Sequence, residues 1–147
     1  MEILPGAGVA DVTIGDRRAD VEERLGPPVH PGTSPRAVYR TDPSLVVSYD
    51  GDVVELVEIA CTGGGQEVFF DGVQLSYRVM DDVVAELEAK GHRCTVSDVG
   101  FDVVAGFSLF SMSSSDARAL DPLAGDADER AIVEGVSVAP YAYFVGT

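Results

Sequence analysis

The chain has 147 residues, the length of one ordinary domain, and its 46% hydrophobic and 24% charged residues suit a folded globular protein. Ten basic against twenty-five acidic side chains give a net charge of −15, which repels phosphate backbones and argues against nucleic-acid binding. No apolar run approaches the roughly 20 residues that span a bilayer, and residues 1–5 carry no export signal, so we expect a cytoplasmic protein with no membrane segment. The acidity either keeps the protein soluble or steers it toward a basic partner.

The first half of the chain predicts a short helix followed by three strands. Val21 and Leu25 lie one turn apart in a helical pattern over residues 16–25, which Gly26 and two prolines end. Residues 50–51, an Asp-Gly pair, are a hairpin signal because glycine tolerates the positive φ of a tight turn. The predicted strands cover residues 37–40, 45–49 and 53–60.

The second half predicts the same order of elements. A helix is expected over residues 80–90, where Leu87 stands as Leu25 does in the first helix and Gly91 supplies the stop. The predicted strands cover residues 94–97, 101–110 and 132–139.

The last strands of the two halves correspond position by position. The matched pairs are Val53/Ile132, Val54/Val133, Glu55/Glu134, Val57/Val136, Ile59/Val138 and Ala60/Ala139. We therefore interpret the chain as two helix-plus-three-strand units, a pseudo-repeat of residues 9–60 and 70–139 joined by glycines at 63–65.

One such unit cannot bury its apolar strand face alone, so the two units should form a single domain over residues 1–147. We predict an α+β fold with one antiparallel sheet of six to eight strands, built from two αβββ units, and both helices on one face. Val57, Ile59, Val136 and Val138 should then meet Val21, Leu25, Val83 and Leu87 of the helices. The opposite face of the sheet would be a platform for another protein.

Residues 113–130 interrupt the second unit before its last strand. This stretch is rich in Ser, Ala, Asp and Gly, with five acids and two arginines, and we expect a surface loop. A loop of this length is either functional or mobile.

The tandem layout carries a family resemblance. The opening segment GVADVTIGDRRADV, residues 8–21, followed by LGPP at residues 25–28, resembles the β-lactamase-inhibitor-protein/SmpA-OmlA lipoprotein fold group and small bacterial cytosolic proteins with the same duplication. The resemblance implies a binding protein rather than an enzyme. The chain departs from the group because it has no lipobox cysteine near its start and lacks the disulfide-bonded, secreted character of the inhibitors.

Few residues suggest catalysis or a bound ion. His92 and Cys94 would share a strand face and, with Cys61, could supply three zinc ligands or a thiolate paired with an imidazole. No CxxC or HxxxH spacing supports such a site, and both thiols are expected to be free and reduced. We predict neither a metal nor a cofactor.

Functions of different classes remain open. The first is a non-enzymatic protein-binding module, such as an immunity-like or inhibitor-like protein, that binds a basic partner through the rim of the sheet. The predicted contact residues are Tyr49, Asp50, Asp52, Tyr141 and Tyr143, although these tyrosines could instead cap the core with their hydroxyls in water. The alternative is a small-molecule-binding protein or an enzyme with a pocket between the sheet, the helices and the 113–130 loop. A structural subunit without a separate activity is a third possibility.

Overall fold

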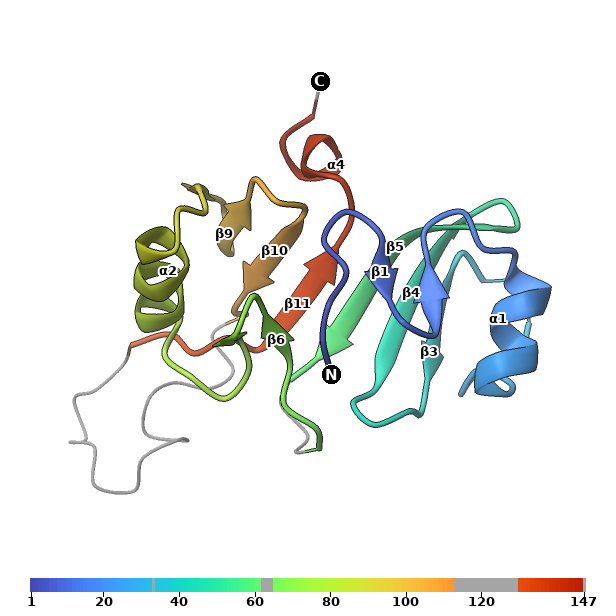
Figure 1. Ribbon diagram of the computed structural model, residues 1–147. Helices are drawn as coiled ribbons and strands as arrows, with labels where there is room; N and C mark the ends of the chain where they lie inside the picture. The colour runs from blue at the N-terminus through green and yellow to red at the C-terminus, as the bar shows by residue number, and fades with distance from the viewer. Residues whose placement is uncertain (33, 62–64, 113–129, 147) are drawn as a thin grey trace.

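The computed structural model describes residues 1–32, 34–61, 65–112 and 130–146 (Figure 1). They form an α+β fold around one seven-stranded sheet in which every neighbouring pair of strands is antiparallel. In spatial order the strands are β3 (Arg36–Tyr39), β4 (Leu45–Asp50), β5 (Val53–Ala60), β11 (Gly135–Val138), β10 (Phe107–Phe110), β9 (Gly100–Val103) and β8 (Cys94–Val96).

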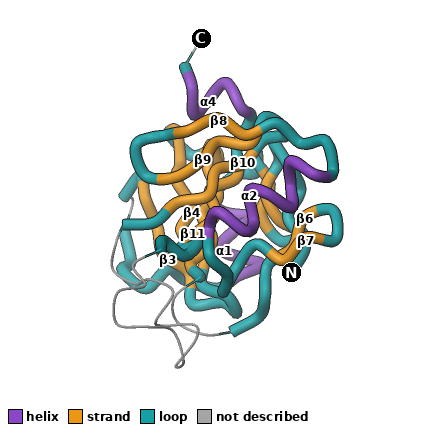
Figure 2. The backbone as a smooth tube through the Cα atoms, turned by 90° about the vertical axis from the view of Figure 1, so that its left-hand side faces the viewer, coloured by secondary structure: helices purple, strands orange, loops and turns teal. Residues whose placement is uncertain are grey.

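Two small hairpins and three helices complete the described part of the chain. The hairpins are β1 (Gly8–Val9) with β2 (Val12–Thr13) and β6 (Phe69–Phe70) with β7 (Val73–Gln74); the helices are α1 (Arg18–Leu25), α2 (Met80–Ala89) and α4 (Tyr141–Val145). Helix α4 lies at one end of the molecule, in contact with β9 (Figures 1 and 2). Within the described ranges no helix is long and apolar enough to cross a bilayer.

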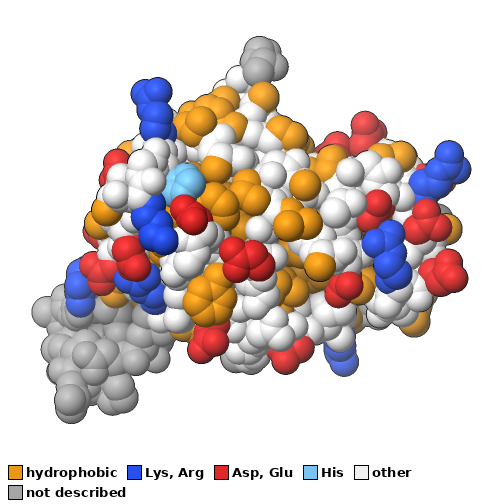
Figure 3. All heavy atoms as spheres, viewed as in Figure 1, with side chains coloured by type: hydrophobic (Ala, Val, Ile, Leu, Met, Phe, Trp, Pro, Cys, Tyr) orange, Lys and Arg blue, Asp and Glu red, His pale blue; other side chains and the backbone are white. Residues whose placement is uncertain are grey.

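The core follows from the two-residue alternation of the strands. Leu45, Val47 and Tyr49 of β4 are buried, as are Val57 and Ile59 of β5. The same hydrophobic cluster contains Val21 of α1, Val83 and Leu87 of α2, and Val136 and Val138 of β11, with Leu25 packed against it and partly exposed. On the side of the molecule seen in Figure 1, charged side chains gather toward the two ends and apolar ones in the middle (Figure 3).

The two halves of the sheet meet where β5 pairs with β11. Val57 lies opposite Val138, and Ile59 lies opposite Val136. All four side chains are fully buried, so this junction lies inside the core. The predicted hairpin between β4 and β5 is confirmed, with Gly51 at φ +62°.

The prediction of one strand over residues 101–110 was wrong. This run forms β9 and β10, joined by a turn in which Gly106 has φ +123° and its N–H donates to the Val103 carbonyl at 2.9 Å. A β-carbon at Gly106 would lie 2.4 Å from the backbone nitrogen of Gly6, so only glycine fits. Apolar residues continue through the turn, which is why periodicity alone did not reveal it.

The remaining predictions concern the C-terminal segment and two connections between elements. The segment after Pro140 was interpreted as sheet rim, but it forms α4, which ends where the Gly146 N–H donates to the Ala142 carbonyl. The predicted loop over residues 113–130 lies outside the described residues except for Arg130, as do residues 63–64 of the predicted glycine link.

Candidate functional site

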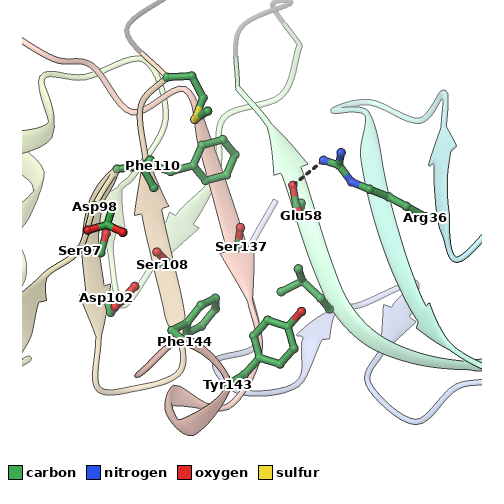
Figure 4. A pocket seen from close by; sticks show the side chains of 13 residues that line it. Arg36, Glu58, Ser97, Asp98, Asp102, Ser108, Phe110, Ser137, Tyr143 and Phe144 are labelled. Carbon is green, nitrogen blue, oxygen red and sulfur yellow. Dashed lines mark hydrogen bonds and ion pairs between the residues drawn. The ribbon is translucent and has the colours of Figure 1, made fainter. Parts of the chain in front are cut away.

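A groove of about 490 Å³ lies on the face of the sheet opposite the core residues of β5 and β11. Strand residues form its floor, the connection between β8 and β9 forms one wall, and α4 covers one end (Figure 4). Its floor residues alternate with core residues along each strand, so the sheet that builds the core also positions the groove.

Four polar side chains cross the floor of the groove in register. Asp102 of β9 lies opposite Ser108 of β10, Ser108 lies opposite Ser137 of β11, and Ser137 lies opposite Glu58 of β5. Because neighbouring strands are about 4.8 Å apart, the row spans roughly 14 Å. It places a carboxylate at each end and two hydroxyls between them.

The two carboxylates of this row have different surroundings. Glu58 pairs with Arg36 of β3, with Oε2 at 3.2 Å from Nη2. Asp102 is only 7% exposed, and no described residue forms a hydrogen bond or ion pair with its carboxylate. At the same end, the Ser97 Oγ is buried without a hydrogen-bond partner among the described residues, and Asp98 lies beside it (Figure 4). The Asp102 end of the groove therefore carries negative charge that the described side chains do not neutralise.

Helix α4 contributes two aromatic rings to the groove. The Tyr141 hydroxyl lies 3.1 Å from the Oγ1 of Thr95 on β8, which attaches the helix to the edge of the sheet. Phe144 lies near Asp102, and Tyr143 lies on the side toward β5 (Figure 4). The rings of Tyr143 and Phe144 contact each other edge to face, with centroids 5.6 Å apart.

Two carboxylates also act on the aromatic wall of the groove. Burial and the neighbouring carboxylates of Glu55 and Glu58 raise the pKa of Tyr143 above its ordinary value. A cationic group would therefore meet favourable charge along this wall as well as at Asp102.

The far end of the groove depends on one glycine. A β-carbon at Gly135 of β11 would lie 2.0 Å from Cζ of Phe110, so the aromatic ring occupies the space that a side chain would fill. A second hollow of about 260 Å³ continues from here and shares Arg36, Glu58 and Phe110 with the groove. The glycine thus allows an aromatic side chain to lie over the sheet between the two hollows.

The structure does not bring the five sequence-predicted contact residues together. Tyr143 lines the groove, and Tyr141 supports α4 without lining it. Asp50 and Asp52 are exposed in the turn between β4 and β5, outside the groove lining. The expectation that Tyr49 lies at an exposed rim was wrong, because it is 3% exposed and points into the core with Leu45 and Val47.

The cysteines and histidine considered as a zinc or catalytic group are separate from the groove. Cys61 is buried, with Sγ directed to the Ile59 carbonyl at 3.7 Å, and Cys94 is partly exposed on β8. His92 interacts with Asp71, with Nε2 and Oδ2 2.9 Å apart. Among the described residues, no group of three or more His, Cys, Asp or Glu side chains could hold a metal ion.

Sequence reasoning missed Asp102, Ser108 and Ser137 as groove residues. The signal was present, because each stands between apolar residues that are buried or partly buried: Ser137, for example, stands between Val136 and Val138. What the sequence did not supply was the pairing that aligns the three side chains across neighbouring strands.

No family model, curated protein or solved structure matches the chain.

Proposed function

We propose that the protein is a non-enzymatic binding module that holds a basic partner protein in the groove on its sheet. The observation that carries this proposal is the row from Asp102 to Glu58, which presents an unneutralised carboxylate beside aromatic rings in a chain of net charge −15. Complementary charge speeds encounter and selects partners, and aromatic side chains supply binding energy. An inhibitor-like or immunity-like role, as the family resemblance implies, fits such a surface.

The proposed interface differs from the one that the sequence suggested. It keeps Tyr143 and, as the support of α4, Tyr141, and it no longer includes the buried Tyr49. Asp50 and Asp52 are proposed as outer charges that steer the partner, because both are exposed.

We also propose that the fold consists of two related helix-plus-three-strand units with both helices on one face. Arg17 forms an isolated bridge with Val53, and Val79 forms one with Ile132. These bridges support the proposal, because Arg17 and Val79 each precede a helix while Val53 and Ile132 are matched positions of the two units.

The junction of the sheet supports the same duplication. If Val57 corresponds to Val136 and Ile59 to Val138, a two-fold axis between the strands exchanges the observed pairs Val57–Val138 and Ile59–Val136. Superposition of residues 9–60 on 70–139 in an experimental structure tests the relationship, and helices that fall on opposite faces of the sheet would refute it.

We propose that the protein acts in the cytoplasm, since both cysteines are free and a reducing compartment keeps thiols in this form. The net charge of −15 supports a protein partner rather than a nucleic acid.

A small-molecule ligand is the second candidate. The groove volume of about 490 Å³ lies within the range of roughly 300–1,000 Å³ that is usual for small-molecule sites. Native mass spectrometry of protein purified from its own cells tests this candidate. If the ligand is a small molecule, the protein should carry a fixed additional mass, and no second protein should co-purify with it.

Site-specific crosslinking tests the protein-binding proposal. A photo-reactive phenylalanine at Val38, on the groove face beside Val46, should capture a basic protein, whereas the same residue at the exposed Leu4, which lines neither hollow, should not. The captured protein is then produced recombinantly and titrated calorimetrically against the full chain. We expect an affinity that falls as salt rises and that falls at least about tenfold with Tyr143→Arg but not with Leu4→Arg. Equal capture at both positions, or an affinity that Tyr143→Arg leaves unchanged, would refute the proposed surface.

A further inference from the structure

We propose that the Asp102 end of the groove is a subsite for one guanidinium group, supplied by an arginine side chain of the partner. This inference rests on the proposed function and specifies the chemistry of the partner at one position. It is carried by the surroundings of Asp102, Ser97 and Asp98 rather than by the overall acidity of the chain.

The side chain of Asp102 is mostly removed from water. A carboxylate that is largely withdrawn from water loses part of its favourable solvation, and a cation or hydrogen-bond donors that face it recover that loss. Asp102 is 7% exposed and lines the groove, yet none of the described residues donates to its carboxylate. A cationic group that enters the groove would supply the missing interaction.

Four other carboxylates of the fold contrast with Asp102, because each of them has a partner within the protein. Asp16 accepts from Thr13 and Arg24, Glu58 pairs with Arg36, Asp71 interacts with His92, and Glu86 pairs with Arg78. Asp102 is more deeply buried than these four, and of the two carboxylates in the floor row only Glu58 has a partner among the described residues.

The neighbours of Asp102 provide further acceptors. The buried Ser97 Oγ has no hydrogen-bond partner among the described residues, and the exposed Asp98 adds a second carboxylate at the same end (Figure 4). Ser108 donates its hydroxyl hydrogen to the Phe101 carbonyl at 3.3 Å, so its oxygen keeps two lone pairs that can accept. These hydrogen-bond acceptors at the Asp102 end of the groove suit a guanidinium group, which has five N–H donors and no acceptor.

The aromatic wall favours guanidinium over ammonium. Phe144 lies beside Asp102 (Figure 4), and a planar guanidinium can stack on an aromatic ring while its edge donates two parallel hydrogen bonds to a carboxylate. A lysine ammonium is more strongly hydrated and has no planar face, so it would lose more solvation for fewer contacts.

The test titrates the full chain with N-acetyl-arginine methylamide and follows the amide resonances by NMR. The matched probes are the citrulline compound, which has the same shape without the charge, and the lysine compound. We expect the arginine probe to shift resonances around Asp102, Ser97 and Ser108 and to bind at least about tenfold more tightly than the citrulline probe. The lysine probe should bind more weakly than the arginine probe, and equal binding of any two probes would refute a guanidinium subsite.

Two variants locate the effect. Asp102→Asn keeps the shape of the side chain and should weaken arginine binding at least about tenfold, whereas Asp82→Asn, an exposed acid of α2, should leave it unchanged. Unchanged affinity in a folded Asp102→Asn protein would overturn the inference. If that variant does not fold, the exposed Asp98→Asn serves instead, with a loss of at least about threefold expected and no loss counting against the subsite.

The two proposals fail in different ways. If the arginine probe binds at Asp102 but crosslinking from Val38 captures no basic protein, the partner proposal fails and the subsite stands. If crosslinking identifies a basic partner whose affinity is the same for wild type and Asp102→Asn, the subsite fails and the protein-binding function stands.

Discussion

The hydroxyl oxygens of Tyr39 and Tyr49 lie 2.8 Å apart inside the core, on the neighbouring strands β3 and β4. Tyr39 is fully buried and Tyr49 nearly so, and each hydroxyl has the other as its hydrogen-bond partner. The Arg18 guanidinium lies over the Tyr49 ring, with Cζ 4.0 Å from the centroid, and donates to the Ser34 carbonyl. This cluster joins the edge of the sheet to the first turn of α1.

Removing both hydroxyls of this pair should cost less than the sum of the costs of removing each one alone. Tyr39→Phe or Tyr49→Phe leaves one buried hydroxyl without a partner, and we expect each to lower the free energy of unfolding by about 1–2 kcal/mol. The double variant should lose less than the sum of the two single losses, because no polar atom is then left unpaired. Denaturation in urea measures all four proteins, and additive losses within about 0.5 kcal/mol would show that the hydroxyls are not coupled.

The same pair predicts a loss of stability in alkali. Burial raises the pKa of Tyr39, and raises that of Tyr49 more strongly, above the ordinary value of 10.0. A raised pKa means that the folded state holds the proton more tightly, so this stability is fully present below pH 10 and is lost as the pH rises above it. The free energy of unfolding of the wild type should therefore fall more steeply above pH 10 than that of the double phenylalanine variant. Parallel curves from neutral pH to about pH 11 would contradict this expectation.

The two thiols should differ in reactivity. Cys61 is 2% exposed, and burial raises the pKa of its thiol to about 12, whereas Cys94 is partly exposed at the edge strand β8. In native protein at about pH 8 we expect a disulfide reagent such as dithiodipyridine to modify Cys94 and to reach Cys61 only on unfolding. Cys94→Ser should abolish the native reaction and Cys61→Ala should preserve it. Two thiols that react at one rate in the native state would be inconsistent with the buried position of Cys61.

The position of the Phe110 ring should require glycine at residue 135. Gly135→Ala places a β-carbon 2.0 Å from the Phe110 ring, and we expect the overpacking to cost about 1–3 kcal/mol of unfolding free energy. In a Phe110→Ala background the same glycine substitution should cost less than about 0.5 kcal/mol, because the colliding ring is gone. Equal costs in both backgrounds would place the strain elsewhere on β11.

Local patterns in the sequence predicted much of this fold. The helical spacing of Val21 and Leu25 predicted α1, and an Asp-Gly pair predicted the β4–β5 turn, because both signals depend on residues close together in the chain. The alternation of strand residues also predicts a buried Tyr49, because it lies two and four residues after the buried Val47 and Leu45, on the same face of the strand. Its position beside the predicted turn suggested an exposed rim residue instead, and that prediction was wrong.

The groove could not be predicted in the same way. Its floor depends on which strands are neighbours, and residues 102, 108, 137 and 58 come together only through the order β9-β10-β11-β5. A shift of one residue in any pairing would move one of these side chains to the opposite face. Helix α4 is a single turn of five residues, too short for a periodic pattern to reveal it.

The pairing of β5 with β11 also bears on how the chain folds during synthesis. Ala60 lies opposite Gly135, 75 residues later, so the middle of the sheet cannot close until the last strand has left the ribosome. At roughly 5–20 residues per second this delay is about 4–15 seconds, during which the long edge of β5 stays without its partner. Glu55 and Glu58 lie along that strand, and their charge would discourage pairing with the β5 strands of other nascent chains.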